Sequence, residues 1–503
     1  MNLLPSSFYH WLIGCAAALL LTAPAFAQTS APPGRPAPPP GAWTLSNTLD
    51  YALINNLGLQ GSDLTSRLDV ATLGQSRAAM LPAINGQATH TYQYGTSVDP
   101  VTYQFQSNTI RANNFSLNGS VPLYQGGVLR NTVVRNRLSA AASAQDLEKA
   151  KADLLLNVAS GYLQVLLTRE TLRAAELQRT TTTGQLEQAE KRLRAGAIAE
   201  SNVLDVRAQV ATEDLNVVTA QNNLTIAILR LEQQLNLDPA EVPPGQFQIA
   251  EPVIALPGAD APIDLTAQQV YDVAAGVRPE LKAADLRLQA ALKGVDVARG
   301  NYWPRLSFGA SLFTAYSSQR SNFIPTGDTV LRPVGFGLLP GTTKPDITKV
   351  VYSFQPKLEQ KPTNFTNQFQ DNFGKQLGFT LTVPILNGLQ VRTQVKRSQL
   401  QAQQAQLSAD QVRVTLRQSI EQAVADAEAA RRRYAAATRQ REALDLSLRN
   451  ADIRFANGLL NATDFNQIKN NRARAENDQI QAKYDFVFKR KVLDLYMGKP
   501  LEL

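Results

Sequence analysis

The chain has 503 residues, a formal net charge of +8, one cysteine and two histidines. This scarcity excludes an internal disulfide framework and multi-histidine metal sites, and it disfavours histidine-based acid–base catalysis. The sequence contains no GxSxG, Walker or HExxH motif. Carboxylate-only enzymes stay open in principle, but the composition favours a protein that is not an enzyme and needs no cofactor.

The positive charge could attract nucleic acid or anionic lipid. The longest purely basic runs are triplets such as Arg431–Arg433, and they lie in sequence of helical character. We interpret them as parts of solvated helix faces. The N-terminus also indicates export from the cell interior, so no nucleic-acid partner is predicted.

The N-terminal segment predicts a secretory signal peptide over residues 1–27. Its apolar run, "WLIGCAAALLLTAPAFA", ends in a small-x-small triplet and is too short for an ordinary membrane-spanning helix. Cleavage after Ala27 would leave a mature chain without cysteine. The string "LIGC" offers an alternative, a lipoprotein processing site that would leave Cys15 as a lipidated N-terminus. Too little apolar sequence precedes Cys15 for this alternative to be favoured.

A Pro-rich leader over 28–42, containing "APPGRPAPPP", is expected to be extended. The remaining sequence contains one unit twice, at 43–237 and 264–503, joined by a linker at 238–263. The clearest match pairs "VPLYQGG", which starts at 121, with "VPILNGL", which starts at 383. That offset of 262 residues then persists without a gap through about seventy residues, so helix length itself is constrained.

Each repeat is predicted to hold two strands, a long helix, a tip and a returning helix. In the first repeat these are strands within 83–122, a helix over 127–194, a tip at 195–202 and a helix over 203–237. In the second repeat they are strands within 305–383, a helix over 389–456, a tip at 457–464 and a helix over 465–497. A Pro- and Gly-rich loop over 317–372 has no counterpart in the first repeat.

The predicted strands alternate apolar and polar residues with period two. Phe115, Leu117 and Val121 alternate with serine and asparagine, and Leu377, Phe379 and Leu381 alternate with glycine and threonine. Runs of about ten residues suit a tilted membrane-crossing strand and also a soluble sandwich. Four strands are too few to close a membrane barrel, and lipid does not tolerate open strand edges. If these strands enter a membrane, several chains must share one barrel, and three chains would supply twelve strands.

The two long helices would each extend about 100 Å at 1.5 Å per residue. Their apolar residues form a weak heptad pattern, which Arg179 and Arg441 interrupt at matching positions. An antiparallel coiled coil and a curved wall of helices around a lumen both fit this pattern.

Together, these features resemble the TolC-like outer-membrane efflux channels over about 43–237 and 264–500. The resemblance includes "RLRAG" and "RFANG" at the tips and "LEQQLNL" and "LDLYMGKP" at the ends of the repeats. It implies a mainly α fold with a β-barrel portion: a homotrimer whose shared 12-stranded outer-membrane β-barrel continues into a periplasmic α-barrel. Residues 317–372 would then form an extracellular loop.

The same resemblance implies a passive exit duct of a tripartite efflux or type I secretion system. Its partners would be a periplasmic adaptor, an inner-membrane pump of RND, MFS or ABC type, and outer-membrane lipid. Two other hypotheses compete with this one, a periplasmic adaptor and a structural coiled-coil protein of the envelope. An adaptor would show one hairpin inserted into a lipoyl-like domain, and a coiled-coil protein leaves the alternating strands unexplained.

The tips carry the candidate contact residues. Glycine permits a helix to reverse, and Ser201 and Thr463 are expected to cap the returning helices. By resemblance, the small and apolar tip residues would meet the adaptor. These are Gly196, Ala197, Ile198, Gly458, Leu459 and Leu460.

The resemblance also predicts a pore constriction just after each tip. The corresponding residues are Asn202 and Asp205 in the first repeat and Asp464 and Gln467 in the second. In a trimer, Asp464 would supply three close carboxylates that attract a divalent cation. Family members carry aspartates at such positions, so Asn202 and Gln467 weaken the expected cation selectivity.

Overall fold

A computed structural model describes residues 41–98, 103–106, 109–237, 247–252, 265–338, 340, 342–457 and 459–499. The predicted signal peptide, the Cys15 alternative, and most of the leader and linker lie outside these residues. The chain divides into two compact units. We name them the helical unit (1–65, 145–281 and 413–503) and the strand unit (66–144 and 282–412).

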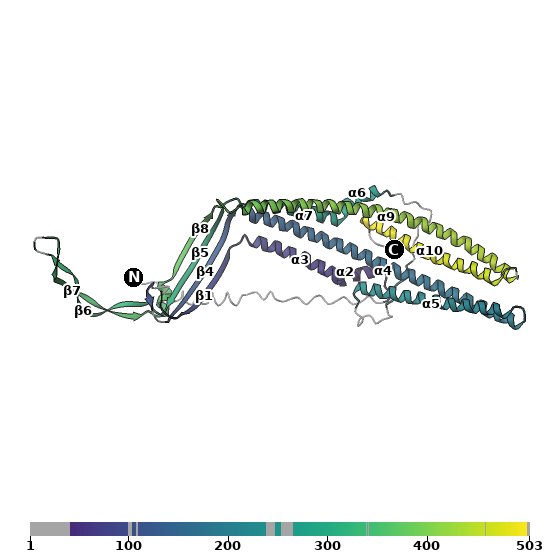
Figure 1. Cartoon of the computed structure of the whole chain (residues 1–503), viewed down its shortest axis with the longest axis horizontal. Coiled ribbons are helices and arrows are strands. Elements are labelled where there is room, and N and C mark those ends of the chain that lie inside the picture. The colour runs from purple at the N-terminus through teal and green to yellow at the C-terminus, as the bar shows by residue number, and fades with distance from the viewer. Residues whose placement is uncertain are drawn as a thin grey trace. The chain divides into compact units, whose positions relative to one another are not determined.

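The strand unit is built on one antiparallel sheet with strand order β1-β4-β5-β8 (Figure 1). Its strands are β1 (Ala83–Gln93), β4 (Ile110–Gln125), β5 (Arg305–Ser317) and β8 (Gly374–Thr382). The two repeats join where β4 pairs with β5. Within the described residues, β1 and β8 each pair on one side only, so the sheet has two open edges.

The pairing register gives this sheet one apolar and one polar face. Leu117 lies opposite Leu312, and Phe308 lies between Val121 and Phe379. Because side chains alternate across a strand, the residues between them face the other way. These intervening residues are mostly serine, asparagine, glutamine and threonine. On β8 the apolar side chains are largely exposed. The short helix α8 (Phe365–Asp371) packs against Phe115 at one end of this face, and one chain alone leaves the β8 part uncovered.

The segment predicted as a loop over 317–372 contains regular structure. It holds two 18-residue strands, β6 (Ser321–Leu338) and β7 (Pro345–Pro362), followed by the short helix α8 (Phe365–Asp371). Among the described strands, β6 and β7 pair with each other alone. The described part of the first repeat has at this place the two-residue strands β2 (Ser97–Val98) and β3 (Phe105–Gln106). Proline and glycine interrupt the sequence alternation here, so cross-strand pairing was not evident from local pattern.

The two repeats contain the same order of helices. The two shorter pairs are α2 (Leu45–Asn55) with α3 (Leu57–Ala78), and α6 (Ala267–Val277) with α7 (Pro279–Gly300). The two hairpins are α4 (Val128–Arg194) with α5 (Glu200–Leu235), and α9 (Gln390–Ala456) with α10 (Ala462–Tyr496). The long helices α4 and α9 have 67 residues each. Among the described helices, none has the length and apolarity that crossing a bilayer would require.

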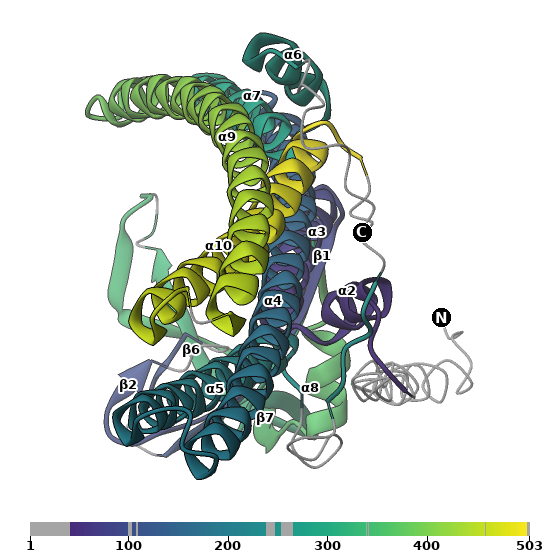
Figure 2. The ribbon, with the colours of Figure 1, turned by 90° about the vertical axis from the view of Figure 1, so that its right-hand side faces the viewer.

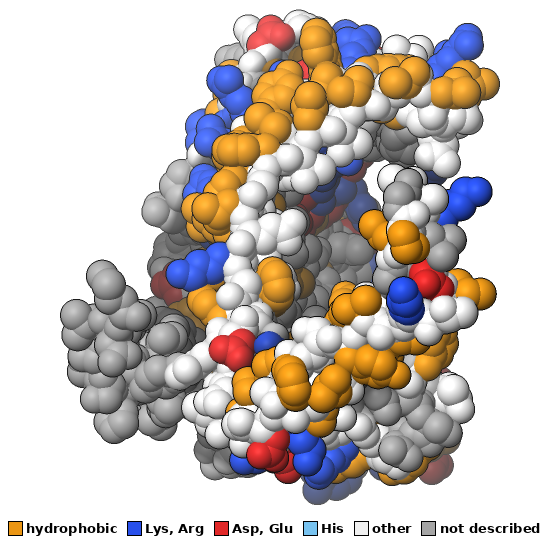
Figure 3. Space-filling view, turned by 90° about the vertical axis from the view of Figure 1, so that its left-hand side faces the viewer, with side chains coloured by type: hydrophobic (Ala, Val, Ile, Leu, Met, Phe, Trp, Pro, Cys, Tyr) orange, Lys and Arg blue, Asp and Glu red, His pale blue; other side chains and the backbone are white. Residues whose placement is uncertain are grey.

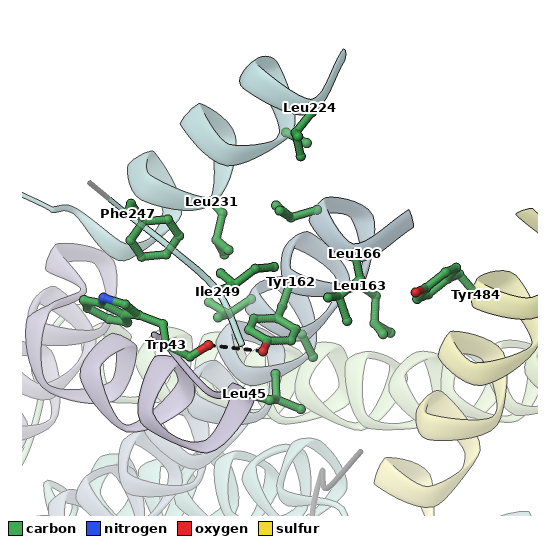
Figure 4. Packing of buried hydrophobic residues seen from close by; sticks show 14 of the residues in the cluster. Trp43, Leu45, Tyr162, Leu163, Leu166, Leu224, Leu231, Phe247, Ile249 and Tyr484 are labelled. Carbon is green, nitrogen blue, oxygen red and sulfur yellow. Dashed lines mark hydrogen bonds between the residues drawn. The ribbon is translucent and has the colours of Figure 1, made fainter. Parts of the chain in front are cut away.

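The main hydrophobic core of the helical unit surrounds Tyr162 of α4 (Figure 4). The segments around Trp43 and Ile249 form a parallel bridge beside it. The Tyr162 hydroxyl lies 2.7 Å from the Ala250 carbonyl and 3.1 Å from that of Trp43, and it donates to them. Burial raises the pKa of Tyr162 to about 12. The start of the first repeat and the described part of the linker are thus both bonded to α4.

Two glycines that match across the repeats differ in their surroundings and offer a test of the strand unit. Gly126 and Gly388 both have φ of +58°, where a side chain is strained. A Cβ at Gly126 would lie 2.3 Å from the Gly300 carbonyl oxygen and 2.6 Å from Trp303 Cβ, whereas one at Gly388 would meet nothing within 4 Å.

We expect Gly388→Ala to cost about 1–2 kcal/mol from backbone strain alone. Gly126→Ala should cost about 1–3 kcal/mol more, because the methyl group must displace a packed backbone. Thermal unfolding midpoints of the two variants in one detergent would compare these costs. Equal midpoints would show that the close approach of Gly126 to Gly300 does not constrain the fold.

Candidate functional site at the helix tips

The first tip is a glycine-terminated reversal between α4 and α5, and Figure 2 looks at it from the end of the hairpins. The Ala197 N–H donates to the Arg192 carbonyl at 2.9 Å, and the Gly196 N–H donates to Leu193, also at 2.9 Å. With Gly196 at φ of +70°, this is the Schellman arrangement that satisfies the last carbonyls of a helix. The predicted role of Gly196 in the reversal is confirmed.

The second tip ends its long helix with the same main hydrogen bond. The Leu459 N–H donates to the Arg454 carbonyl at 2.9 Å, which matches the bond between Ala197 and Arg192 in the first repeat. Gly458, the predicted counterpart of Gly196, lies outside the described residues.

The predicted helix caps are wrong at both tips. α5 begins after Ala199, which makes no side-chain cap, so Ser201 lies inside the first turn. α10 begins after Asn461, whose Oδ1 accepts from the Asp464 N–H at 2.7 Å, so Thr463 is also inside the helix. Both returning helices start three residues earlier than predicted, because the reversal is completed within a shorter loop.

Each tip has a buried apolar residue beneath an exposed surface. Val203 and its repeat counterpart Phe465 are both buried, and Phe465 stacks on Phe455 with ring centroids 4.6 Å apart. Of the predicted adaptor-contact residues, Gly196, Ala197 and Leu459 are exposed, Leu459 at 70%, whereas Ile198 and Leu460 are half-buried. At each tip, buried apolar side chains therefore support small and apolar residues that are exposed on the surface.

The four predicted constriction residues are all exposed on the first turns of α5 and α10. Asp464 shares a capping arrangement, since the Asn461 Nδ2 donates to its carboxylate at 2.9 Å. The Gln467 side chain donates to Asn471 at 3.0 Å. In the part of the chain that the structure describes, no three His, Cys, Asp or Glu side chains are placed to hold a metal. A ring of carboxylates would therefore need more than one copy of the chain.

The arginines that interrupt the heptad pattern link each long helix to its returning helix. Arg179 of α4 contacts Asp214 of α5 at 2.5 Å, and Arg441 of α9 donates to Gln479 of α10 at 2.8 Å. The two arginines occupy matching positions of the repeats and make matching contacts between helices.

A buried lysine joins the two hairpins, and sequence reasoning missed it. Lys469 of α10 is only 3% exposed, and its Nζ donates to Thr182 Oγ1 at 2.7 Å and to Gln185 Oε1 at 2.8 Å, both on α4. The carboxylates of Glu213 on α5 and Asp452 on α9 add favourable electrostatics from two further helices. Nothing in the local sequence distinguishes this lysine from those on solvated faces.

Burial dominates the ionisation of this cluster. It lowers the pKa of Lys469 to about 8, against the opposing attraction of Glu213 and Asp452. Desolvation likewise raises the pKa of Asp452 above its ordinary value, although Lys469 partly offsets this. A polar group held so deeply between helices forms a specific junction between the two repeats.

Comparisons with known proteins agree on one family. The model of the outer membrane efflux protein family matches residues 48–237 and 270–499. An uncharacterized protein of Haemophilus influenzae is 24% identical over 69% of this chain and 73% of its own length. The pyoverdine export outer membrane protein OpmQ of Pseudomonas aeruginosa is 26% identical over 58% of this chain and 62% of its own length.

A solved structure shares the fold. The Campylobacter jejuni CmeC outer membrane channel superposes with a TM-score of 0.70 at 18% identity, covering 90% of this chain and 85% of that one. The predicted fold class, mainly helical with an antiparallel β portion as in TolC-like channels, is therefore confirmed.

The buried lysine makes stability depend on pH in a defined direction. Between pH 8 and 10.5 the unfolded chain binds more protons at Lys469 than the folded chain, so the free energy of unfolding rises with pH. The full effect is of order 3 kcal/mol. We expect Lys469→Met to abolish this rise and Lys151→Met, at a 39% exposed side chain, to preserve it.

Thermal midpoints measured at pH 8, 9 and 10 for the parent and both variants would test this expectation. If the midpoint difference between the parent and Lys469→Met stays constant with pH, Lys469 does not titrate in this range.

Proposed function

The chain belongs to the outer membrane efflux protein family, which makes it an outer-membrane efflux channel, and we propose that three copies form one exit duct. The duct would serve a tripartite efflux or type I secretion system, in which an adaptor and an inner-membrane pump supply substrate and energy. The observation that carries this proposal is the four-stranded sheet, which within the described residues has two open edges and an apolar face left uncovered along β8.

The open edges favour sharing of strands between copies. In lipid, each unpaired backbone N–H or C=O costs several kcal/mol, so an edge such as β1 or β8 must find a partner. Pairing β1 of one copy with β8 of the next satisfies both edges at once. Three copies give twelve strands, above the minimum of eight for a membrane barrel. The apolar face would then meet lipid, and the serine- and asparagine-rich face would line a wet lumen.

The hairpins would continue this lumen into the periplasm. Amide side chains such as Asn216, Asn223, Asn470 and Asn477 line a polar groove of about 470 Å³ between α4, α5 and α10. A polar surface of this kind suits a water-filled passage. We therefore assign conduction, without chemistry, to the helical unit.

The tips would provide the adaptor contact. Ala197 and Leu459 are exposed on a reversal that buried Val203 and Phe465 hold rigid, and exposed apolar groups on a rigid support are suited to protein contacts. The relatives' names include pyoverdine export and toxin and drug export, so small molecules and polypeptides are both candidate cargoes.

The face assignment of the sheet can be tested with neighbouring residues of β8. Phe379 lies on the apolar face and Thr380 on the polar face. An arginine facing lipid costs about 2–4 kcal/mol per chain at the bilayer midplane. We expect Phe379→Arg to abolish trimers in outer-membrane fractions and Thr380→Arg to preserve them.

Trimers would be detected on gels without heating and by native mass spectrometry in detergent. Purified parent should also form conducting channels in planar bilayers. A parent chain that is monomeric and water-soluble without detergent, or equal loss in both variants, would contradict the shared sheet.

The proposed constriction can be tested in both directions. Asp464 and Gln467 lie three residues apart and share one face of α10. We expect Asp464→Asn to weaken block of the channel by trivalent cations at least several-fold, because it removes three carboxylates from the ring. Gln467→Asp should strengthen the block, because it adds three. Single-channel recordings with the cation on the tip side measure this, and two unaltered blocking constants would place the constriction elsewhere.

A further inference from the structure

The proposed duct assigns no role to the β6–β7 hairpin, which we name the ribbon. Its strands of 18 residues would extend about 60 Å at 3.3 Å per residue. Figure 1 shows it as a two-stranded arm leaving the strand unit next to β5 and β8. Among the described elements, no other helix or strand packs extensively along it.

One face of the ribbon is more apolar than the other, which carries Ile324, Val330 and Val351 among polar residues. Leu331 pairs with Phe354, and Phe336 pairs with Val350, so these side chains share a face with Tyr352 and Leu358. The intervening residues of β7 are mostly polar, namely Ser353, Gln355, Lys357 and Glu359. Phe354 is 69% exposed. Figure 3, the view from the end at which Figure 1 labels β6 and β7, shows hydrophobic side chains interspersed with Lys, Arg, Asp and Glu.

The base of the ribbon is held firmly. Gln368 of α8 is fully buried; its Nε2 donates to the carbonyls of Ser317 and Thr363, and its Oε1 accepts from the Ser317 N–H at 2.9 Å. The Thr363 N–H also donates to the Arg320 carbonyl at 2.9 Å. These bonds join the two feet of the ribbon just beyond β5, so the ribbon leaves the sheet in a defined register.

An isolated ribbon of this kind requires a cover. Two-stranded hairpins are marginally stable in water unless an apolar face packs against something. Lipid is a poor cover, because both outer edges carry unpaired backbone groups. Addition of further strands at these edges is also disfavoured, because Pro325, Pro333 and Pro356 cannot donate hydrogen bonds. Face-to-face packing with a similar ribbon satisfies these constraints, because it buries the apolar face and leaves the polar face in water.

We propose that the apolar faces of three ribbons pack against one another around the duct axis and form a collar at its outer mouth. The inference rests on the proposed trimer, in which each copy contributes one ribbon rooted between β5 and β8 of the shared sheet. Charge supports the orientation: each polar face carries Arg332, Lys357 and Lys361 against Glu359, so the faces would repel one another if they faced inward. The collar would extend the trimer beyond the membrane surface.

Single cysteines at neighbouring residues of β6 test the packing. Leu331 lies on the apolar face, and the adjacent residue Val330 lies on the polar face. Their partners on β7 are Phe354 and Gln355. We expect Leu331→Cys and Phe354→Cys to be linked between copies by a short bis-maleimide at least ten-fold more than Val330→Cys and Gln355→Cys. The parent chain gives the baseline for Cys15, and the trimer is counted independently by native mass spectrometry of unlinked samples.

The outcomes separate the inference from the proposed duct. Intact trimers without preferential linking at Leu331 and Phe354 would overturn the collar and leave the duct standing. The collar would also be overturned if a fluorophore on Leu331→Cys in reconstituted vesicles were quenched by nitroxide-labelled lipid, because the ribbon would then lie on the membrane. Absence of trimers would overturn both.

Discussion

The backbone hydrogen bonds at the two edges of the β1-β4-β5-β8 sheet constrain the whole protein. Among the described elements, no strand pairs with the outer side of either edge strand, and the apolar side chains of β8 are largely exposed. Water can satisfy such edges, but lipid cannot. A chain that places this sheet in a membrane must therefore complete it with other copies. The duplicated architecture follows naturally, since each repeat contributes two strands and one hairpin to a common wall.

The helical unit meets a different requirement, which is to hold long rods in register. Apolar packing alone would let helices of this length slide, because their heptad pattern is weak and rich in alanine. Specific polar contacts at intervals remove that freedom. Arg179 and Arg441 connect each long helix to its partner, Lys483 of α10 pairs with Glu170 of α4 at 2.9 Å, and Lys469 joins the hairpins near the tips. Buried polar groups cost stability, and their best-attested benefit is a unique register.

The two repeats differ most in the segments that have different neighbours in the structure. Gly126 and Gly388 keep the same backbone conformation, yet only Gly126 is packed against another segment. The first repeat connects its strands with a short β2–β3 hairpin, whereas the second carries the long ribbon. The long helices have the same length in both repeats, whereas the connections between the strands differ. This difference indicates that the length of the helical passage is constrained more strongly than the form of its outer mouth.

The sequence alone determined the repeat, the strand alternation, the long helices and the glycine reversal at the first tip, because each depends on local periodicity or on the conformational freedom of one residue. Tertiary structure decided the rest. The caps at Ala199 and Asn461 depend on how early the chain turns back, and the burial of Lys469 depends on α10 lying against α4. The ribbon depends on pairing between strands whose prolines and glycines mask the alternation. Such features arise from contacts between distant residues, which no local pattern encodes.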